Sequence, residues 1–137
     1  MGNEVFRYDG KRVLVVGGAT GMGAAAATAV SELGAEVVVM DYKPVDGFTS
    51  IVVDLRDKDQ IDAAIDQCGG TVDALFSCAG VADGTEGIER INFLGHRHMI
   101  DRLFEHDRPT LRKGDAPQGL LDHVYFLGRW PRMVQQY

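Results

Sequence analysis

The chain has 137 residues, of which 45% are hydrophobic and 25% are charged, with a net charge of -6. This length suits one domain, and the composition is typical of a soluble globular protein. The negative charge argues against a protein that binds nucleic acid, and no apolar run approaches the roughly 18 residues that a membrane span needs. The N-terminus has no apolar signal stretch, so we expect a cytoplasmic protein without membrane contact.

The two cysteines, Cys68 and Cys78, stand in no metal-binding spacing. We therefore expect two reduced thiols rather than a disulfide or a zinc site. His96 and His98 do not share a helix face, so a metal site is not expected there either. We expect both histidines to lie on a solvent-exposed helix face.

The composition changes near Phe104. Residues 1–104 carry 9 basic and 16 acidic side chains, whereas residues 105–137 carry 5 and 4. Three of the four prolines also fall in the last segment. This division predicts one domain over residues 1–104 and an atypical tail over residues 105–137.

Apolar, β-branched runs alternate with helical patterns over the first hundred residues. The predicted strands are Arg12–Val16, Glu36–Met40, Ser50–Val53 and Ala74–Ser77. The predicted helices run from Met22 to a C-terminal Gly34, from Asp59 to Cys68 behind an Asp57 N-cap, and from Glu86 to Phe104. Alternating strands and helices predict an α/β fold with a Rossmann-type doubly wound parallel sheet.

Glycine is repeated with GxxxGxG spacing at Gly17, Gly21 and Gly23, between the first strand and the first helix. In a nucleotide-binding loop, such glycines allow a tight turn, a close approach to a pyrophosphate, and close packing of helix on strand. The loop alone is a weak signal, and an unspecific glycine turn is the alternative.

Asp41 ends the second predicted strand. In a dinucleotide-binding fold, a carboxylate at this point accepts hydrogen bonds from both hydroxyls of the adenosine ribose, which favours NAD. A 2′-phosphate about 4 Å away would be repelled by about 4 kcal/mol at an effective dielectric constant of 20. Lys43 could soften that repulsion, so NADP stays open as the less favoured cofactor. An ordinary turn aspartate is the alternative.

Together these residues resemble the short-chain dehydrogenase/reductase family, which uses the GxxxGxG spacing. Asp54-Leu55 is similar to the pair that contacts adenine in that family, and Ser77-Cys78-Ala79-Gly80 is similar to its NNAG element. Asn92-Phe93-Leu94-Gly95 matches the family's NxxG. These elements stand in family order over residues 11–104, and the resemblance implies that the chain holds the N-terminal half of the family's doubly wound sheet. The stretch RINFLGHRHMIDRLF resembles the branch of 3α-hydroxysteroid and coniferyl-alcohol dehydrogenases.

The resemblance implies an NAD-dependent oxidoreductase that transfers hydride between nicotinamide and a small-molecule alcohol or ketone. It implies a catalytic role for Asn92, for which an ordinary polar helix residue is the alternative. It also implies that copies of the chain associate through the helix over residues 86–104. The implied cofactor contacts are Gly17, Ala19, Thr20, Gly21, Met22, Gly23, Asp41, Tyr42, Asp54, Leu55, Cys78, Ala79 and Gly80.

The catalytic Ser, Tyr and Lys of the family have no counterpart in the sequence. No serine follows Ser77, and there is no YxxxK. The nearest imitation is Tyr125 with Arg129, but an arginine cannot be deprotonated, and Gly128 and Pro131 oppose the helix that would align the pair. Nothing after Phe104 predicts a fifth strand, so we expect the fourth strand to have an unpaired edge.

Two interpretations of the tail remain open. Residues from about 105 to 137 are frameshifted sequence in a truncated enzyme, or the chain is a natural short variant whose tail caps the sheet through Val124, Phe126, Leu127 and Trp130. Three functions accordingly compete: an oxidoreductase with an unrecognised proton donor, a non-catalytic NAD-binding or partner module, and a truncated product without function.

Overall fold

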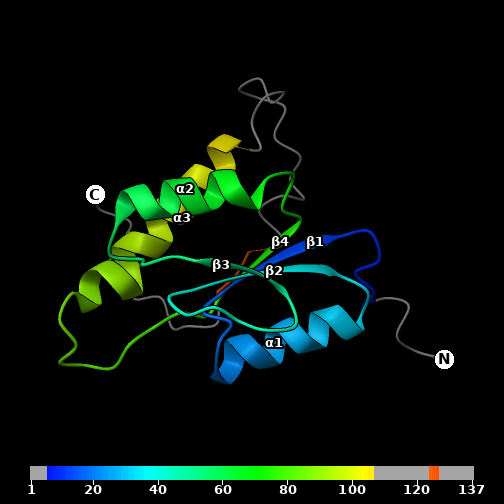
Figure 1. The fold of residues 1–137 in the computed structure, drawn as a ribbon, viewed down its shortest axis with the longest axis horizontal. Coiled ribbons are helices and arrows are strands. Elements are labelled where there is room, and N and C mark those ends of the chain that lie inside the picture. Colours follow the sequence, from blue (N-terminus) through cyan, green and yellow to red (C-terminus); the bar gives the residue numbers. More distant parts are fainter. Residues whose placement is uncertain (1–5, 107–123, 127–137) are drawn as a thin grey trace.

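A computed structural model of the chain describes residues 6–106 and 124–126. One parallel sheet has the strand order β3-β2-β1-β4-β5, with α1 on one face and α2 and α3 on the other (Figure 1). The predicted Rossmann-type α/β fold is therefore confirmed. The elements are β1 (Arg12–Val16), α1 (Gly21–Glu32), β2 (Glu36–Asp41), β3 (Thr49–Val52), α2 (Lys58–Cys68), β4 (Ala74–Ser77), the π-helical segment η2 (Arg90–Leu94), α3 (Gly95–His106) and β5 (Val124–Phe126).

The central strand β1 is buried on both faces. Val13 and Val15 pack toward α1, with Ala27 and Val30 of that helix. Leu14 and Val16 belong to the core on the other face, to which α2 and α3 contribute Ile61, Ile65 and Met99. Because side chains alternate along a strand, one β-branched run supplies both cores.

The helix boundaries follow local chemistry. Asp57 caps α2 as predicted, because its side chain accepts hydrogen bonds from the backbone N–H groups of Asp59 and Gln60. Gly34, predicted to end α1, has φ of +99°, a conformation that favours glycine, and follows the C-cap residue Leu33.

The predicted continuous helix over residues 86–104 is wrong in its first part. Gly87 has φ of +76° and lies in a turn, and the π-helical η2 precedes α3. Gly95, at the junction, packs so closely on the Leu55 carbonyl that a side chain would overlap it. Leu94 on η2 is 48% exposed. Self-association through this helix stays a prediction.

The expectation that the tail supplies no fifth strand is also wrong. Val124–Phe126 forms β5, which pairs in parallel with β4 through the register Leu75 to Val124, Phe76 to Tyr125 and Ser77 to Phe126. The free edge of β4 is thereby paired, as the interpretation of a sheet-capping tail requires. Of the residues named for that cap, Leu127 and Trp130 lie outside the described residues. Within the described residues, no helix is long and apolar enough to cross a membrane.

Candidate functional site

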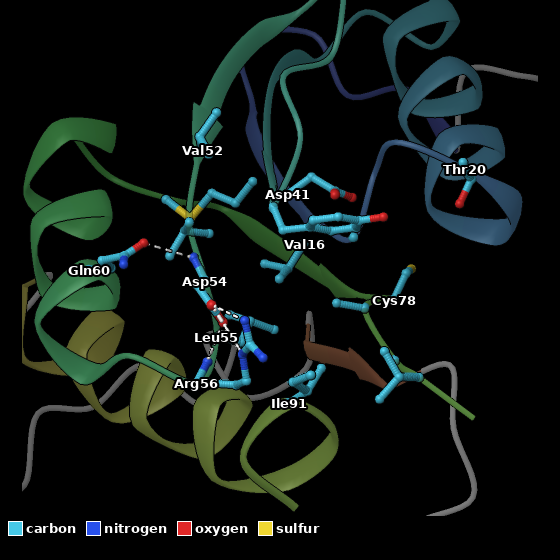
Figure 2. Close-up of a pocket in the computed structure, with 17 residues that line it drawn as sticks. Val16, Thr20, Asp41, Val52, Asp54, Leu55, Arg56, Gln60, Cys78 and Ile91 are labelled. Atoms are coloured by element: carbon cyan, nitrogen blue, oxygen red, sulfur yellow. Dashed lines mark hydrogen bonds and ion pairs between the residues drawn. The ribbon is translucent and has the colours of Figure 1, made fainter. Parts of the chain in front are cut away.

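A pocket of about 570 Å³ opens at the carboxyl ends of the strands. It lies at the point where the order of the strands in the sheet changes direction, because β1 has β2 as its neighbour on one side and β4 as its neighbour on the other. Figure 2 shows Gln60, Asp54 and Arg56 at one end and Thr20 and Cys78 at the other. The lining residues are Val16, Gly17, Thr20, Met40, Asp41, Tyr42, Val52, Val53, Asp54, Leu55, Arg56, Gln60, Cys78, Ala79, Gly80, Val81 and Ile91.

The glycines of the first loop have separate mechanical roles. Gly17 has φ of +83°, and a side chain there would overlap the backbone of Ala79. Gly23 packs against the carbonyl oxygen of Gly17, where a side chain would again overlap. Gly21 has φ of +57° but faces open space. The loop is therefore held tightly against the sheet and the segment after β4, while its outer side is open to a ligand.

Asp41 connects the glycine loop to the pocket. Its side chain is buried, with the residue only 8% exposed, and it lines the pocket. Oδ2 accepts a hydrogen bond of 2.9 Å from the backbone N–H of Ala19, and Oδ1 accepts one of 3.3 Å from that of Lys43. These bonds fix the carboxylate at the end of β2, where the sequence predicts contact with a ribose.

At the other end of the pocket, the Asp54 carboxylate is paired with a residue that sequence reasoning missed. The Arg56 guanidinium donates to both carboxylate oxygens, at 3.0 Å from Nε to Oδ1 and 2.6 Å from Nη2 to Oδ2, and so holds the pKa of Asp54 below its usual range. Gln60 accepts from the Asp54 N–H at 3.1 Å and donates to Asp57 at 3.1 Å. The signal was available, because Arg56 stands two residues after Asp54.

The segment after β4 forms the wall beside the glycine loop. Cys78 donates its backbone N–H to the Val16 carbonyl at 2.8 Å, which continues the pairing of β4 with β1. Cys78 is half-buried, and burial raises the pKa of its thiol. Cys68, the last residue of α2, is buried in the core.

His96 contradicts the sequence interpretation. Rather than lying on a solvated face, it is 5% exposed, and burial lowers its pKa. Its Nδ1 is hydrogen-bonded to the Ser77 hydroxyl, and its Nε2 lies 2.8 Å from the carbonyl oxygen of Ala79. His98 is partly buried as well, with Nε2 at 2.6 Å from Asp62 of α2. The interpretation failed because α3 turns both histidines toward neighbouring elements.

Asn92 lies outside the pocket lining, but its side chain is hydrogen-bonded to Val81, which lines the pocket. Its side-chain amide donates to the Val81 carbonyl at 2.9 Å and accepts from the Val81 N–H at 2.8 Å. The catalytic role implied by the resemblance stays a prediction. Four residues implied as cofactor contacts are likewise not among those that line the pocket: Ala19, Gly21, Met22 and Gly23.

The nearest imitation of YxxxK receives no support from position. Tyr125 lies in β5, where its backbone is paired with that of Phe76, and Arg129 lies outside the described residues. Within the part of the chain that the structure describes, no cluster of three His, Cys, Asp or Glu side chains could hold a metal ion.

Comparisons with known proteins identify relatives of this chain. Short-chain dehydrogenase reductase 5 of Arabidopsis thaliana is 34% identical over 91 residues, covering 56% of this chain and 35% of the relative. The 3-alpha-hydroxysteroid dehydrogenase/carbonyl reductase of Comamonas testosteroni is 24% identical over 112 residues, covering 80% and 42%. The chain thus spans less than half the length of these relatives.

Solved structures share the fold. The crystal structure of gox2181 has a TM-score of 0.66 and 26% identity, covering 77% of this chain and 52% of that one. A short-chain dehydrogenase/reductase mutant of Serratia marcescens has a TM-score of 0.62 and 25% identity, covering 72% and 52%. The family model described as short chain dehydrogenase matches residues 11–106, well over half of the chain. This protein therefore belongs to the short-chain dehydrogenase family.

Proposed function

We propose that residues 1–104 form a nucleotide-binding unit that binds NAD, and that this unit corresponds to the cofactor-binding part of an NAD-dependent oxidoreductase of its family. The observation that carries this proposal is the buried Asp41 carboxylate, fixed by the Ala19 N–H at the edge of the pocket. A fixed carboxylate with free lone pairs suits the two hydroxyls of an adenosine ribose.

The remaining residues of the pocket fit the rest of an ADP-ribose group. A volume of about 570 Å³ is within the usual range of small-molecule sites, roughly 300–1,000 Å³. Gly21 is open on its outer side at the N-terminus of α1, where the helix dipole favours a pyrophosphate. Asp54 and Leu55 offer a carboxylate and an apolar side chain, which suit an adenine amino group and ring.

NAD is favoured over NADP by charge. A 2′-phosphate would lie beside the Asp41 carboxylate and be repelled by it. Lys43 carries the nearest compensating charge in sequence, but its Nζ lies over the Tyr42 ring, 5.0 Å from the ring centroid. An ammonium stacked on an aromatic ring is already engaged in a favourable interaction.

Binding without turnover is the form of the proposal that suits these 137 residues. Bound NAD would supply a hydride acceptor, but the reaction also needs a group that moves a proton at the substrate oxygen. The sequence has no YxxxK and no serine after Ser77. A small alcohol or ketone remains the substrate class proposed for the family reaction.

Calorimetric titration tests the proposal. NAD and ADP-ribose should bind the intact chain with similar affinity, because the pocket accounts for the ADP-ribose half, and NADP should bind at least tenfold more weakly. Absence of heat with all three nucleotides, from a protein shown to be folded by circular dichroism, would overturn the proposal.

A turnover assay separates binding from catalysis. Incubation of the chain with NADH and a panel of small ketones, followed at 340 nm, should show no enzyme-dependent oxidation. Measurable turnover would replace the binding-only proposal with an oxidoreductase that uses another proton donor. If the chain binds none of the three nucleotides and shows no turnover, a truncated product without function is the interpretation that is left.

A further inference from the structure

We infer that His96 is a positioning residue, which holds the segment Ser77–Gly80 against the glycine loop and so sets the width of the pocket. This inference rests on the proposed nucleotide binding, and it extends that function to a buried side chain outside the pocket lining. His96 and Asp41 are the two buried polar or charged residues of the described chain, and each is bonded to one of the two loops.

The hydrogen bonds of His96, together with its burial, indicate which ring nitrogen carries the proton. The Ala79 carbonyl can only accept, so Nε2, 2.8 Å away, must donate its hydrogen. In a neutral imidazole Nδ1 is then an acceptor, and the Ser77 hydroxyl donates to it. Burial, which lowers the pKa of His96, favours this neutral form. His96 thus bridges the last residue of β4 and the loop that follows.

Ala79 transmits the position of His96 to the glycine loop. The Ala79 backbone packs on Gly17 so closely that a side chain on Gly17 would overlap it. Gly17 in turn receives Gly23 of α1 against its carbonyl oxygen. A shift of Ala79 would therefore displace both walls of the pocket, because Gly17, Ala79 and Gly80 all line it.

Substitutions at position 96 test the inference by rescue. His96→Leu removes both hydrogen bonds and leaves the Ala79 carbonyl without its donor, so ADP-ribose should bind about tenfold more weakly. His96→Gln places an amide N–H near the position of Nε2 and should recover most of the affinity. Equal affinity in wild type and His96→Leu would overturn the inference while leaving nucleotide binding intact.

His98→Leu is the matched control, since His98 lies on the same helix but bonds to Asp62 of α2, away from the pocket. This substitution should lower the thermal stability of the protein without weakening the binding of ADP-ribose. If His98→Leu weakens binding as much as His96→Leu, the effect is general destabilisation, and the inference fails. Should His96→Leu not fold, Ser77→Ala removes one hydrogen bond by a smaller change, and a loss of affinity of several-fold is expected.

Nuclear magnetic resonance supplies a signature that does not depend on nucleotide binding. In protein labelled with ¹⁵N at histidine, His96 should show the neutral tautomer with the proton on Nε2, and Ser77→Ala should shift the Nδ1 resonance. A proton on Nδ1, or a ring that averages between tautomers, would overturn the assignment. If wild type shows the Nε2 tautomer but binds no nucleotide, the proposed function fails. The positioning role of His96 is then tested by amide hydrogen exchange, which should be faster at Ala79 and Gly80 in His96→Leu than in wild type. Unchanged exchange at these two residues would overturn the positioning role.

Discussion

Replacing Asp41 with asparagine removes one charge from the pocket and keeps the shape of the side chain. The amide oxygen can still accept from the Ala19 N–H, which the carboxylate now binds at 2.9 Å. A 2′-phosphate about 4 Å from the carboxylate is repelled by about 4 kcal/mol at an effective dielectric constant of 20. Solvent at the pocket mouth reduces this figure, and we expect NADP to gain about tenfold in affinity.

The same substitution should weaken NAD, because a hydrogen bond from a ribose hydroxyl to a carboxylate is stronger than one to an amide. A loss of about tenfold gives a combined change of about a hundredfold in the ratio of the two dissociation constants. Isothermal titration of Asp41→Asn with NAD and NADP at constant ionic strength measures this ratio directly.

Asp46→Asn is the control for the loss of one negative charge. Asp46 is exposed, lies five residues further along, and does not line the pocket. Its removal should change both affinities by less than about twofold, since exposed charges at a distance are screened by salt. If Asp41→Asn keeps the wild-type ratio, or if Asp46→Asn shifts it equally, the carboxylate of Asp41 does not select the cofactor.

Two further predictions concern stability. Gly23→Ala adds a side chain that overlaps the Gly17 carbonyl, and it should lower the free energy of unfolding by roughly 1–3 kcal/mol in thermal denaturation, whereas Ala25→Val on the exposed side of α1 should lower it by less than about 1 kcal/mol. Equal losses of unfolding free energy in the two variants would show that the close contact between Gly23 and the Gly17 carbonyl does not restrict the side chain at position 23. Asp62 accepts hydrogen bonds from Lys58, His98 and Arg102, and the first two lower its pKa from 3.8 to about 2. A lowered carboxyl pKa stabilises the fold above the unfolded pKa. The advantage of wild type over Asp62→Asn, about 1 kcal/mol after screening by water, should therefore be full above about pH 5 and be lost as the pH falls through 2. A difference in unfolding free energy that is constant from pH 5 to 2 would contradict this linkage.

Much of the fold could be predicted because its signals are local. β1 and β4 begin and end at the predicted residues, since each is a short apolar run with polar or glycine neighbours. Asp57 could be recognised as a cap from its place before a helical pattern. β5 could not, because three residues are too few to show a period, and its pairing depends on the edge of β4, which is distant in sequence.

The position of His96 could have been predicted. Met99, Ile100 and Leu103 follow it by three, four and seven residues, which is the spacing of one helix face, and all three pack in or against the core. The polarity of histidine favours exposure, whereas this position on the helix favours burial, and a buried histidine is stable when both ring nitrogens have partners. The partners themselves, Ser77 and Ala79, could not be inferred without the packing of α3 beside β4.

The described residues include the groups proposed to bind the nucleotide but not the proton-transfer groups of the family. Every described residue that lines the pocket lies between Val16 and Ile91, so the groups proposed for the ribose, the pyrophosphate and the adenine are all present before Asn92. The proton-transfer groups of the family would follow Asn92. An affinity for ADP-ribose equal to that for NAD would mean that these early residues supply the whole binding free energy. If NAD binds clearly more tightly than ADP-ribose, residues after Asn92 would be required to contact the nicotinamide. The tail would then contribute to nucleotide binding.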